Sequence, residues 1–397
     1  MKSTQLNKLI FLLGFLAFFT NGDNYAAAPL LIDIARDLRI EVSAAVLSVT
    51  AYMLCFGLLT IIFGPMGDRF GKARILKIAA FGTGIFSILC ALANSLTTLV
   101  VLRGLNGAFA AGILPVTIAL VGERSEPGER HNVIGKVMGL MFLGGAAATV
   151  IGGLLAYVGS WKLVYTVYGA AELLLALGLL GVSDSVSERV GKLNFVKVYR
   201  EALANRALVK VIGLMFFVGF SVLGSFAFTG KLVENRTGFN ILNVGLLLSL
   251  YGLGTIVGGR NAGSVRKKLG DKFLLIAGII GSAALVMLAL ATNTILMGIS
   301  LFAFGIAFIF LQSTLVTTAQ ELAPRLRGTV MSLASFSMVV SGALGTLMNS
   351  MLIRFGSMQA IFLVAAVMLF IVGILAAAVF GKSPEEKTKF VVPEESI

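Results

Sequence analysis

Charge is scarce in this sequence: only 13% of the 397 residues are Asp, Glu, Lys or Arg, while 57% are hydrophobic. A soluble globular domain carries about 25% charged residues, so this composition argues against a water-soluble fold. Cysteine and histidine are also rare, with two residues and one residue. Their rarity argues against a disulfide framework and against a metal site of Cys and His. The sequence has no Walker-type phosphate loop either, and we expect no enzyme, no cofactor and no metal.

Long apolar runs are abundant instead, and each is long enough to cross a membrane as a helix, which takes about 20 residues. The first run is longer than the apolar core of a signal peptide, about 7 to 15 residues, so we interpret it as a span. We predict twelve spans: 9–31, 43–65, 75–93, 95–121, 135–157, 161–182, 208–230, 241–263, 273–291, 294–319, 330–353 and 358–380.

The net charge of +13 is distributed unevenly among the loops between these spans. With the N-terminus inside, 25 Lys and Arg belong to cytoplasmic segments and 6 to outer segments. This bias predicts that both termini are cytoplasmic, and it favours a lipid bilayer over nucleic acid as the partner of the charge. We expect a multi-pass protein of a cell membrane, in a bacterium the plasma (inner) membrane. The longest polar connection between spans runs from Ser183 to Arg206. It carries the stretch FVKVYREALANRAL, which predicts a basic amphipathic helix on the cytoplasmic surface.

An internal repeat divides the chain. Gly64 and Gly71 are matched 199 residues later by Gly263 and Gly270. A repeat of this length predicts two halves of six helices each in the same orientation. The predicted fold is therefore an all-α membrane protein of twelve transmembrane helices in two pseudo-symmetric six-helix halves. Its parts are an N-terminal bundle (1–182), a cytoplasmic linker with an amphipathic helix (183–207), a C-terminal bundle (208–381) and a cytoplasmic tail (382–397).

The loop between the second and third spans reads GPMGDRFGKAR and resembles the signature loop of the major facilitator superfamily. The matching residues are Gly64, Asp68, Arg69, Gly71, Lys72 and Arg74. The resemblance extends to about residue 381 and implies that this loop latches the two halves in an outward-facing state. Charge-assisted hydrogen bonds of the aspartate would hold such a latch. The alternative is a positively charged anchor with a tight turn at the glycine.

Two further stretches resemble the proton-coupled drug-efflux branch of that superfamily. LVVLRGLNGAFAAG, residues 99–112, places Arg103 where the branch has its arginine and Asn106 where glutamine is more usual. GGAAATVIGG, residues 144–153, keeps the double glycine of an antiporter motif but has Ala148 and Thr149 in place of Gly-Pro. The first match implies proton-coupled efflux, and the departure in the second leaves antiport open.

Three ionisable groups stand out deep within predicted spans, where a charge is costly and usually functional: Asp23, Arg103 and Glu172. Asp23 and Arg103 lie about 12 Å from the same side of the membrane. The resemblance implies that both face a central water-filled cavity, where Asp23 would carry a proton. Glu172 shares a helix face with Tyr165 and Tyr168, whose phenols would satisfy its carboxyl. A structural role for Glu172 therefore stands beside a role in proton coupling.

The predicted function is secondary active transport, namely proton-coupled efflux of small lipophilic or amphipathic compounds by alternating access. The alternatives are a transporter of a defined metabolite, such as a sugar, nucleoside or amino acid, and a non-transporting receptor or scramblase. We expect a monomer whose partners are a small-molecule substrate, protons and lipid. Polar and aromatic residues on the helices implied to line the cavity are candidate substrate contacts: Thr20, Asn24, Asn106, Phe217, Ser221, Phe304, Phe308 and Gln312.

Overall fold

The computed structural model describes residues 3–126, 129–184 and 195–380, and these residues form helices and no β-strand. Before the linker lie α1 (Ser3–Asp37), α2 (Val42–Ala45), α3 (Leu47–Phe70), α4 (Lys72–Ala91), α5 (Leu96–Ala110), α6 (Ile113–Arg124), α7 (Arg130–Val158) and α8 (Trp161–Gly178). After it lie α9 (Phe195–Ala204), α10 (Arg206–Thr237), α11 (Ile241–Leu269), η1 (Gly270–Lys272), α12 (Phe273–Leu290), α13 (Thr294–Leu322), η2 (Pro324–Leu326), α14 (Arg327–Phe355) and α15 (Met358–Phe380). Residues 185–194 of the predicted linker and the predicted tail, 382–397, lie outside the described residues.

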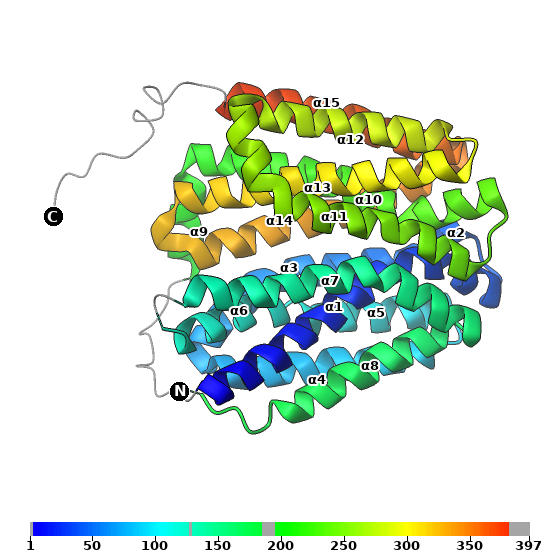
Figure 1. Ribbon diagram of the computed structural model, residues 1–397. Coiled ribbons are helices and arrows are strands. Elements are labelled where there is room, and N and C mark those ends of the chain that lie inside the picture. The colour runs from blue at the N-terminus through cyan, green and yellow to red at the C-terminus, as the bar shows by residue number, and fades with distance from the viewer. Residues whose placement is uncertain (1–2, 127–128, 185–194, 381–397) are drawn as a thin grey trace.

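The described helices have the lengths and surfaces of membrane spans. Nine ranges are long and apolar enough to cross a membrane, and one of them, Ile241–Leu290, contains both α11 and α12. Helices α1 and α8 run within the same bundle (Figure 1) but are not among these ranges. Polar residues, including Asp23 in α1 and Glu172 in α8, lower the mean hydropathy of both helices. Large apolar side chains such as Leu174 remain exposed on the outer surface, which suits lipid better than water.

The predicted repeat is visible in the packing. Figure 1 shows α1 and α3–α8 on one side of the molecule and α10–α15 on the other. In the first group α1 packs on α7, α3 on α5 and α4 on α8; in the second, α10 packs on α14, α11 on α13 and α12 on α15. The repeated turn also has matching geometry, because Gly71 and Gly270 both have positive φ, 98° and 54°. Positive φ favours glycine, which explains why both copies of the turn keep it.

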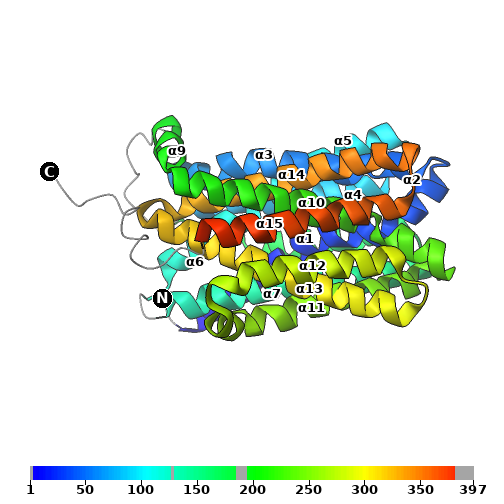
Figure 2. The same ribbon diagram turned by 90° about the horizontal axis from the view of Figure 1, so that it is seen from above.

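The two groups of helices meet through α7 against α11 and α3 against α14. We call the end at which α1 begins and α15 ends the terminal end, and the opposite end, which carries α2, the far end (Figures 1 and 2). Toward the far end the two groups are joined by hydrogen bonds. Thr50 and Thr346 share one of 2.6 Å between hydroxyl oxygens, and Ser350 donates to the carbonyl of Ser43 at 2.8 Å.

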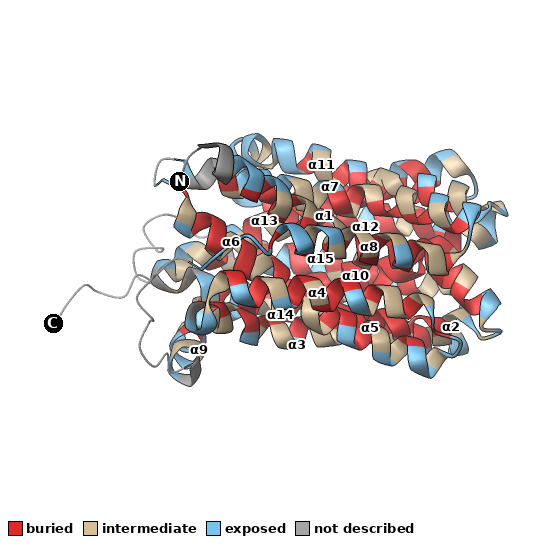
Figure 3. Cartoon of the chain, turned by 90° about the horizontal axis from the view of Figure 1, so that it is seen from below, coloured by how far each residue is buried: buried red, intermediate tan, exposed pale blue. Residues whose placement is uncertain are grey.

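Small residues bring α7 and α11 together. A Cβ atom added at Gly245 would lie 2.2 Å from the carbonyl oxygen of Thr149, so only glycine permits this approach. Gly153, from the double glycine of the antiporter-like stretch, also faces α11. Figure 3 shows buried residues running along the interior of the bundle. The two halves are therefore tightly packed at the far end.

At the terminal end, the short helix α9 packs on α10 and α14 of the second group. Its Tyr199 hydroxyl donates a 2.9 Å hydrogen bond to the carbonyl of Ile61 in α3, which belongs to the first group. The helix expected within FVKVYREALANRAL is thus present, and it contacts both halves of the molecule.

Candidate functional site

A buried polar cluster lies among α1, α4 and α5. The Nη1 atom of Arg103 donates to Oδ2 of Asp23 and to Oδ1 of Asn106, each at 2.9 Å. Asn106 in turn donates to the carbonyl and the hydroxyl of Thr83, at 2.8 and 3.2 Å. The side chains of Asp23 and Arg103 are 1% and 0% exposed. The pair expected from the sequence is therefore formed, and it is a fully buried ion pair.

Aromatic rings surround the guanidinium group. Its central carbon lies 4.2 Å from the ring centroid of Tyr52 and 5.1 Å from that of Tyr165. Rings at these distances attract a cation through their electron-rich faces. Among the described residues, Nε and Nη2 of Arg103 and Oδ1 of Asp23 have no hydrogen-bond partner. The rings thus stabilise the arginine charge, whereas Arg103 is the one side-chain donor to Asp23 within the described part of the chain.

Glu172 of α8 lies beside this cluster and is fully buried. Its Oε1 accepts a 3.1 Å hydrogen bond from the hydroxyl of Thr20, which lies one turn before Asp23 on α1. The expectation that tyrosine phenols satisfy this carboxyl is wrong in the structure. The hydroxyls of Tyr165 and Tyr168 have no partner among the described residues, because the ring of Tyr165 faces Arg103 and that of Tyr168 packs on Phe19.

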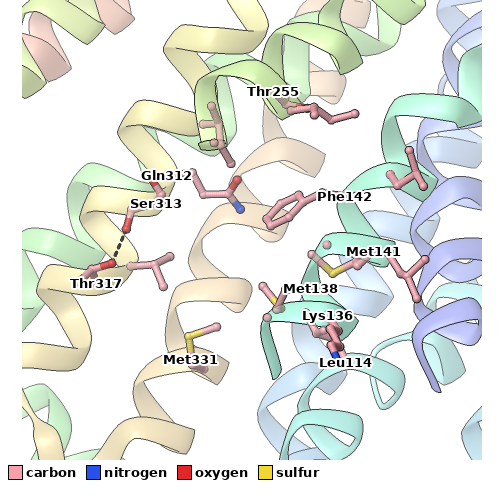
Figure 4. A pocket seen from close by; sticks show the side chains of 18 of the residues that line it. Leu114, Lys136, Met138, Met141, Phe142, Thr255, Gln312, Ser313, Thr317 and Met331 are labelled. Carbon is pink, nitrogen blue, oxygen red and sulfur yellow. Dashed lines mark hydrogen bonds between the residues drawn. The ribbon is translucent and has the colours of Figure 1, made fainter. Parts of the chain in front are cut away.

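A cavity of about 980 Å³ lies between the two halves, toward the terminal end. Its walls come from α1, α6 and α7 on one side and from α10, α11, α13 and α14 on the other. Figure 4 shows Gln312 extending from α13 toward Phe142 of α7 across this space. Neither Asp23 nor Arg103 lines it. The expectation that these two residues face a water-filled cavity thus differs from the structure, because the rings and Asn106 enclose them.

The candidate substrate contacts occupy several environments. Thr20 and Asn106 belong to the buried polar cluster, and Asn24 is half-buried on α1. Gln312 lines the cavity. The hydroxyl of Ser221 donates to the carbonyl of Phe217 in its own helix, and the Phe217 side chain is 45% exposed.

The remaining two candidates form a buried aromatic group with α11. The ring centroids of Phe304 and Phe308 lie 5.2 and 6.0 Å from that of Tyr251. Phe226 of α10 and Tyr25 of α1 extend the same group, so it joins both halves of the molecule.

The signature loop has several contacts with its own half of the molecule. Gly71 separates α3 from α4, and the carboxylate of Asp184 accepts a 2.6 Å hydrogen bond from the amide of Ala73 in the first turn of α4. Lys72 donates to Glu123 at 2.9 Å. Arg69 and Arg74 are exposed, and Gly64 lies near Ser332 of α14. The side chain of Asp68 lies outside the described residues, and the latch stays a prediction.

Sequence reasoning missed several residues of these sites. Thr83 and Tyr52 gave no signal because a threonine or a tyrosine within an apolar span is common. Lys136 and Arg260 were counted with the loops, yet both line the cavity. Their signal was present in the sequence, since both positions fall inside the predicted spans 135–157 and 241–263.

A sequence profile of the Major Facilitator Superfamily matches residues 13–346. An uncharacterized MFS-type transporter, YceJ of Bacillus subtilis (strain 168), is 26% identical over 340 residues, 83% of this chain and 85% of that protein. The multidrug efflux pump LfrA of Mycolicibacterium smegmatis is 28% identical over 236 residues, 56% of this chain and 46% of that protein. A solved structure of a bacterial homologue of the human lysosomal transporter Spinster, inward-facing and unoccupied, has a TM-score of 0.79 at 18% identity, covering 97% of this chain and all of that one.

Proposed function

Since the chain belongs to the major facilitator superfamily, we propose that this secondary transporter exports small lipophilic or amphipathic compounds in exchange for protons. The likeness to the multidrug efflux pump LfrA supports the efflux of such compounds. The cavity supports it too, because its volume suits a drug-sized molecule and most of its lining is apolar.

The cavity is assigned to the cytoplasmic side. The excess of Lys and Arg in the segments at the terminal end supports this orientation. The hydrogen bonds between Thr50 and Thr346 and between Ser350 and Ser43 then close the outer side. With this orientation the conformation of the protein is inward-facing, like that of the Spinster homologue that the chain resembles in fold.

The observation that carries the proton coupling is the buried Asp23–Arg103 pair with Glu172 beside it. Two carboxyl groups and one guanidinium group reach zero net charge only when one carboxyl holds a proton. A buried net charge is costly, so the cluster favours one bound proton. Asp23 Oδ1 and Glu172 Oε2 both lack a partner among the described residues, so a proton on either oxygen breaks no hydrogen bond. Asp23 is the proposed carrier because it is the carboxyl that Arg103 pairs with, so its protonation changes an ion pair.

The coupling links this proton to the conformation of the first half. Protonation of Asp23 removes the ionic attraction to Arg103 of α5 and so weakens the link between α1 and α5 that this ion pair forms. Helix α1 also contributes to the cavity wall and packs against α10 across the interface. A proton on Asp23 would therefore shift the balance between inward-facing and outward-facing states.

The test is transport driven by a pH gradient in proteoliposomes, with a panel of fluorescent amphipathic compounds and a pH dye inside the vesicles. Asp23→Asn should abolish accumulation against a gradient and the accompanying proton flux. Asp33→Asn removes a carboxylate from the same helix near the far end, and this control should retain both signals. A fully coupled Asp23→Asn protein would exclude Asp23 as the carrier, and a parent protein that moves none of the compounds would contradict the proposed function.

A further inference from the structure

The cavity lining contains two cations and, among the described residues, no acid. Lys136 comes from α7 and Arg260 from α11, so each half contributes one positive charge. Neither side chain has a hydrogen-bond or ion-pair partner within the described part of the chain. Both charges are therefore available to a ligand.

These two cations lie inside the helices and not in the loops. Lys136 is six residues after the first residue of α7, and Arg260 is nine residues before the last residue of α11. At 1.5 Å per residue they lie about 9 and about 14 Å along the helix axes from the terminal end. Both cations thus line the part of the cavity toward the terminal end, and both residues are exposed.

The rest of the lining provides a soft apolar surface. Five methionines contribute to it: Met138, Met141, Met215, Met331 and Met338. Methionine is flexible and polarisable, so it packs against apolar bodies of varied shape. Gln312 adds an amide, and its Oε1 is buried without a partner among the described residues. A ligand that fits all three features has an apolar body, a polar group and a negative charge.

We propose that this cavity selects amphipathic anions, with the negative group between Lys136 and Arg260 and the apolar body among the methionines. The inference rests on the proposed function and names the substrate class within it. A guanidinium group presents parallel N–H donors that match a carboxylate, sulfonate or phosphate. An amphipathic cation of the same size meets two like charges and no counter-charge in the lining, so burying it is unfavourable.

An anion of this kind comes from one of two sources, a soluble amphipathic acid or the headgroup of an anionic lipid. The shared chemistry is one negative group beside an apolar body, and the lining does not depend on which source supplies it. The experiment therefore includes an arm that separates the two.

Binding is measured by dansyl fluorescence on purified protein in phosphatidylcholine nanodiscs, without a pH gradient. The probes are dansyl-aminohexanoate and dansylcadaverine, which share a fluorophore and differ in the sign of the terminal charge. The anionic probe should bind at least about tenfold more tightly than the cationic probe, since one hydrogen-bonded ion contact is worth that ratio. Lys136→Gln and Arg260→Gln should each remove much of this preference. Lys267→Gln, an exposed lysine of α11 outside the cavity, is the matched control.

Equal binding of the probes, preference for the cation, or a preference that survives both glutamine variants would overturn the proposal. Lys136→Glu should raise the affinity for the cationic probe, which a variant that merely unfolds cannot do. Nanodiscs of phosphatidylglycerol identify the source: weaker binding of the anionic probe there indicates a lipid, and unchanged binding indicates a soluble acid. The preference should persist in Asp23→Asn, so failure of the coupling and failure of the anion site give different results.

Discussion

The buried pair of Asp23 and Arg103 predicts an asymmetric response to removal of either partner. Arg103→Ala takes away the only side-chain donor to Asp23 among the described residues and leaves a carboxylate without compensation. Breaking a buried ion pair in this way costs about 3 to 5 kcal/mol of unfolding free energy. Asp23→Asn keeps an oxygen that accepts from Arg103, while the rings of Tyr52 and Tyr165 still face the guanidinium group. It replaces a hydrogen-bonded ion pair by a hydrogen bond from the guanidinium group to a neutral oxygen, so we expect a cost of about 1 kcal/mol.

The double variant separates the pair energy from the other losses. In Asp23→Asn with Arg103→Ala neither member of the pair is left as a buried charge without the other. Its cost should therefore fall about 2 kcal/mol below the sum of the single costs, within the range of coupling energies for residues in contact. The control is Arg36→Ala, which removes an arginine whose side chain is 71% exposed and should cost less than about 1 kcal/mol.

Unfolding in detergent is followed through the fluorescence of Trp161, the only tryptophan of the chain, which is buried in α8 next to Tyr165. This probe lies in the same half as the polar cluster, so it reports on the part of the protein that the substitutions affect. Single costs that add to within about 0.5 kcal/mol would refute an energetic link between the two residues. An Arg103→Ala protein as stable as Arg36→Ala would refute the burial argument itself.

Two further substitutions test other parts of the site. Glu172→Gln retains an oxygen for the hydroxyl of Thr20, so stability should change by less than about 1 kcal/mol; loss of pH-driven transport in this stable variant would assign the coupling proton to Glu172. Gly71→Ala should destabilise the protein by about 1 to 3 kcal/mol, because its φ of 98° is strained for alanine. It should cost more than Gly270→Ala, since a Cβ at position 71 meets the carboxylate of Asp184 and one at position 270 meets nothing within 4 Å. Equal unfolding temperatures of the two glycine variants would contradict the prediction that the contact with Asp184 adds to the cost at position 71.

The fold was largely predictable because the signals that determine it are repeated. Apolar runs of span length recur along the chain, and the glycine spacing of 199 residues relates one half to the other. The Asp23–Arg103 pair could also be predicted from the sequence, since a charge within an apolar span requires a partner at the same depth. The depth of the two residues in the membrane follows from the number of residues between each of them and the end of its predicted span.

What the sequence could not provide is the direction in which each side chain points. Depth and helix face placed Asp23 and Arg103 together, but the rotation of α5 that encloses them between Tyr52 and Tyr165 depends on packing against three other helices. The same limit explains Glu172, whose partner is Thr20 on another helix and not a tyrosine of its own. Lys136 and Arg260 were counted as loop charges although they fall just inside the predicted spans, because a span boundary is uncertain by a few residues, and that distance separates a loop from a cavity wall.

The contact of α9 with both halves has a mechanical consequence for the transport cycle. This helix rests on α10 and α14 and crosses to α3 through one hydrogen bond, from Tyr199 to Ile61. Any rocking that widens the mouth at the terminal end must lengthen that bond, whereas rocking that narrows it presses the helix against α3. The linker helix thus opposes a separation of the two halves at this end by the strength of one hydrogen bond.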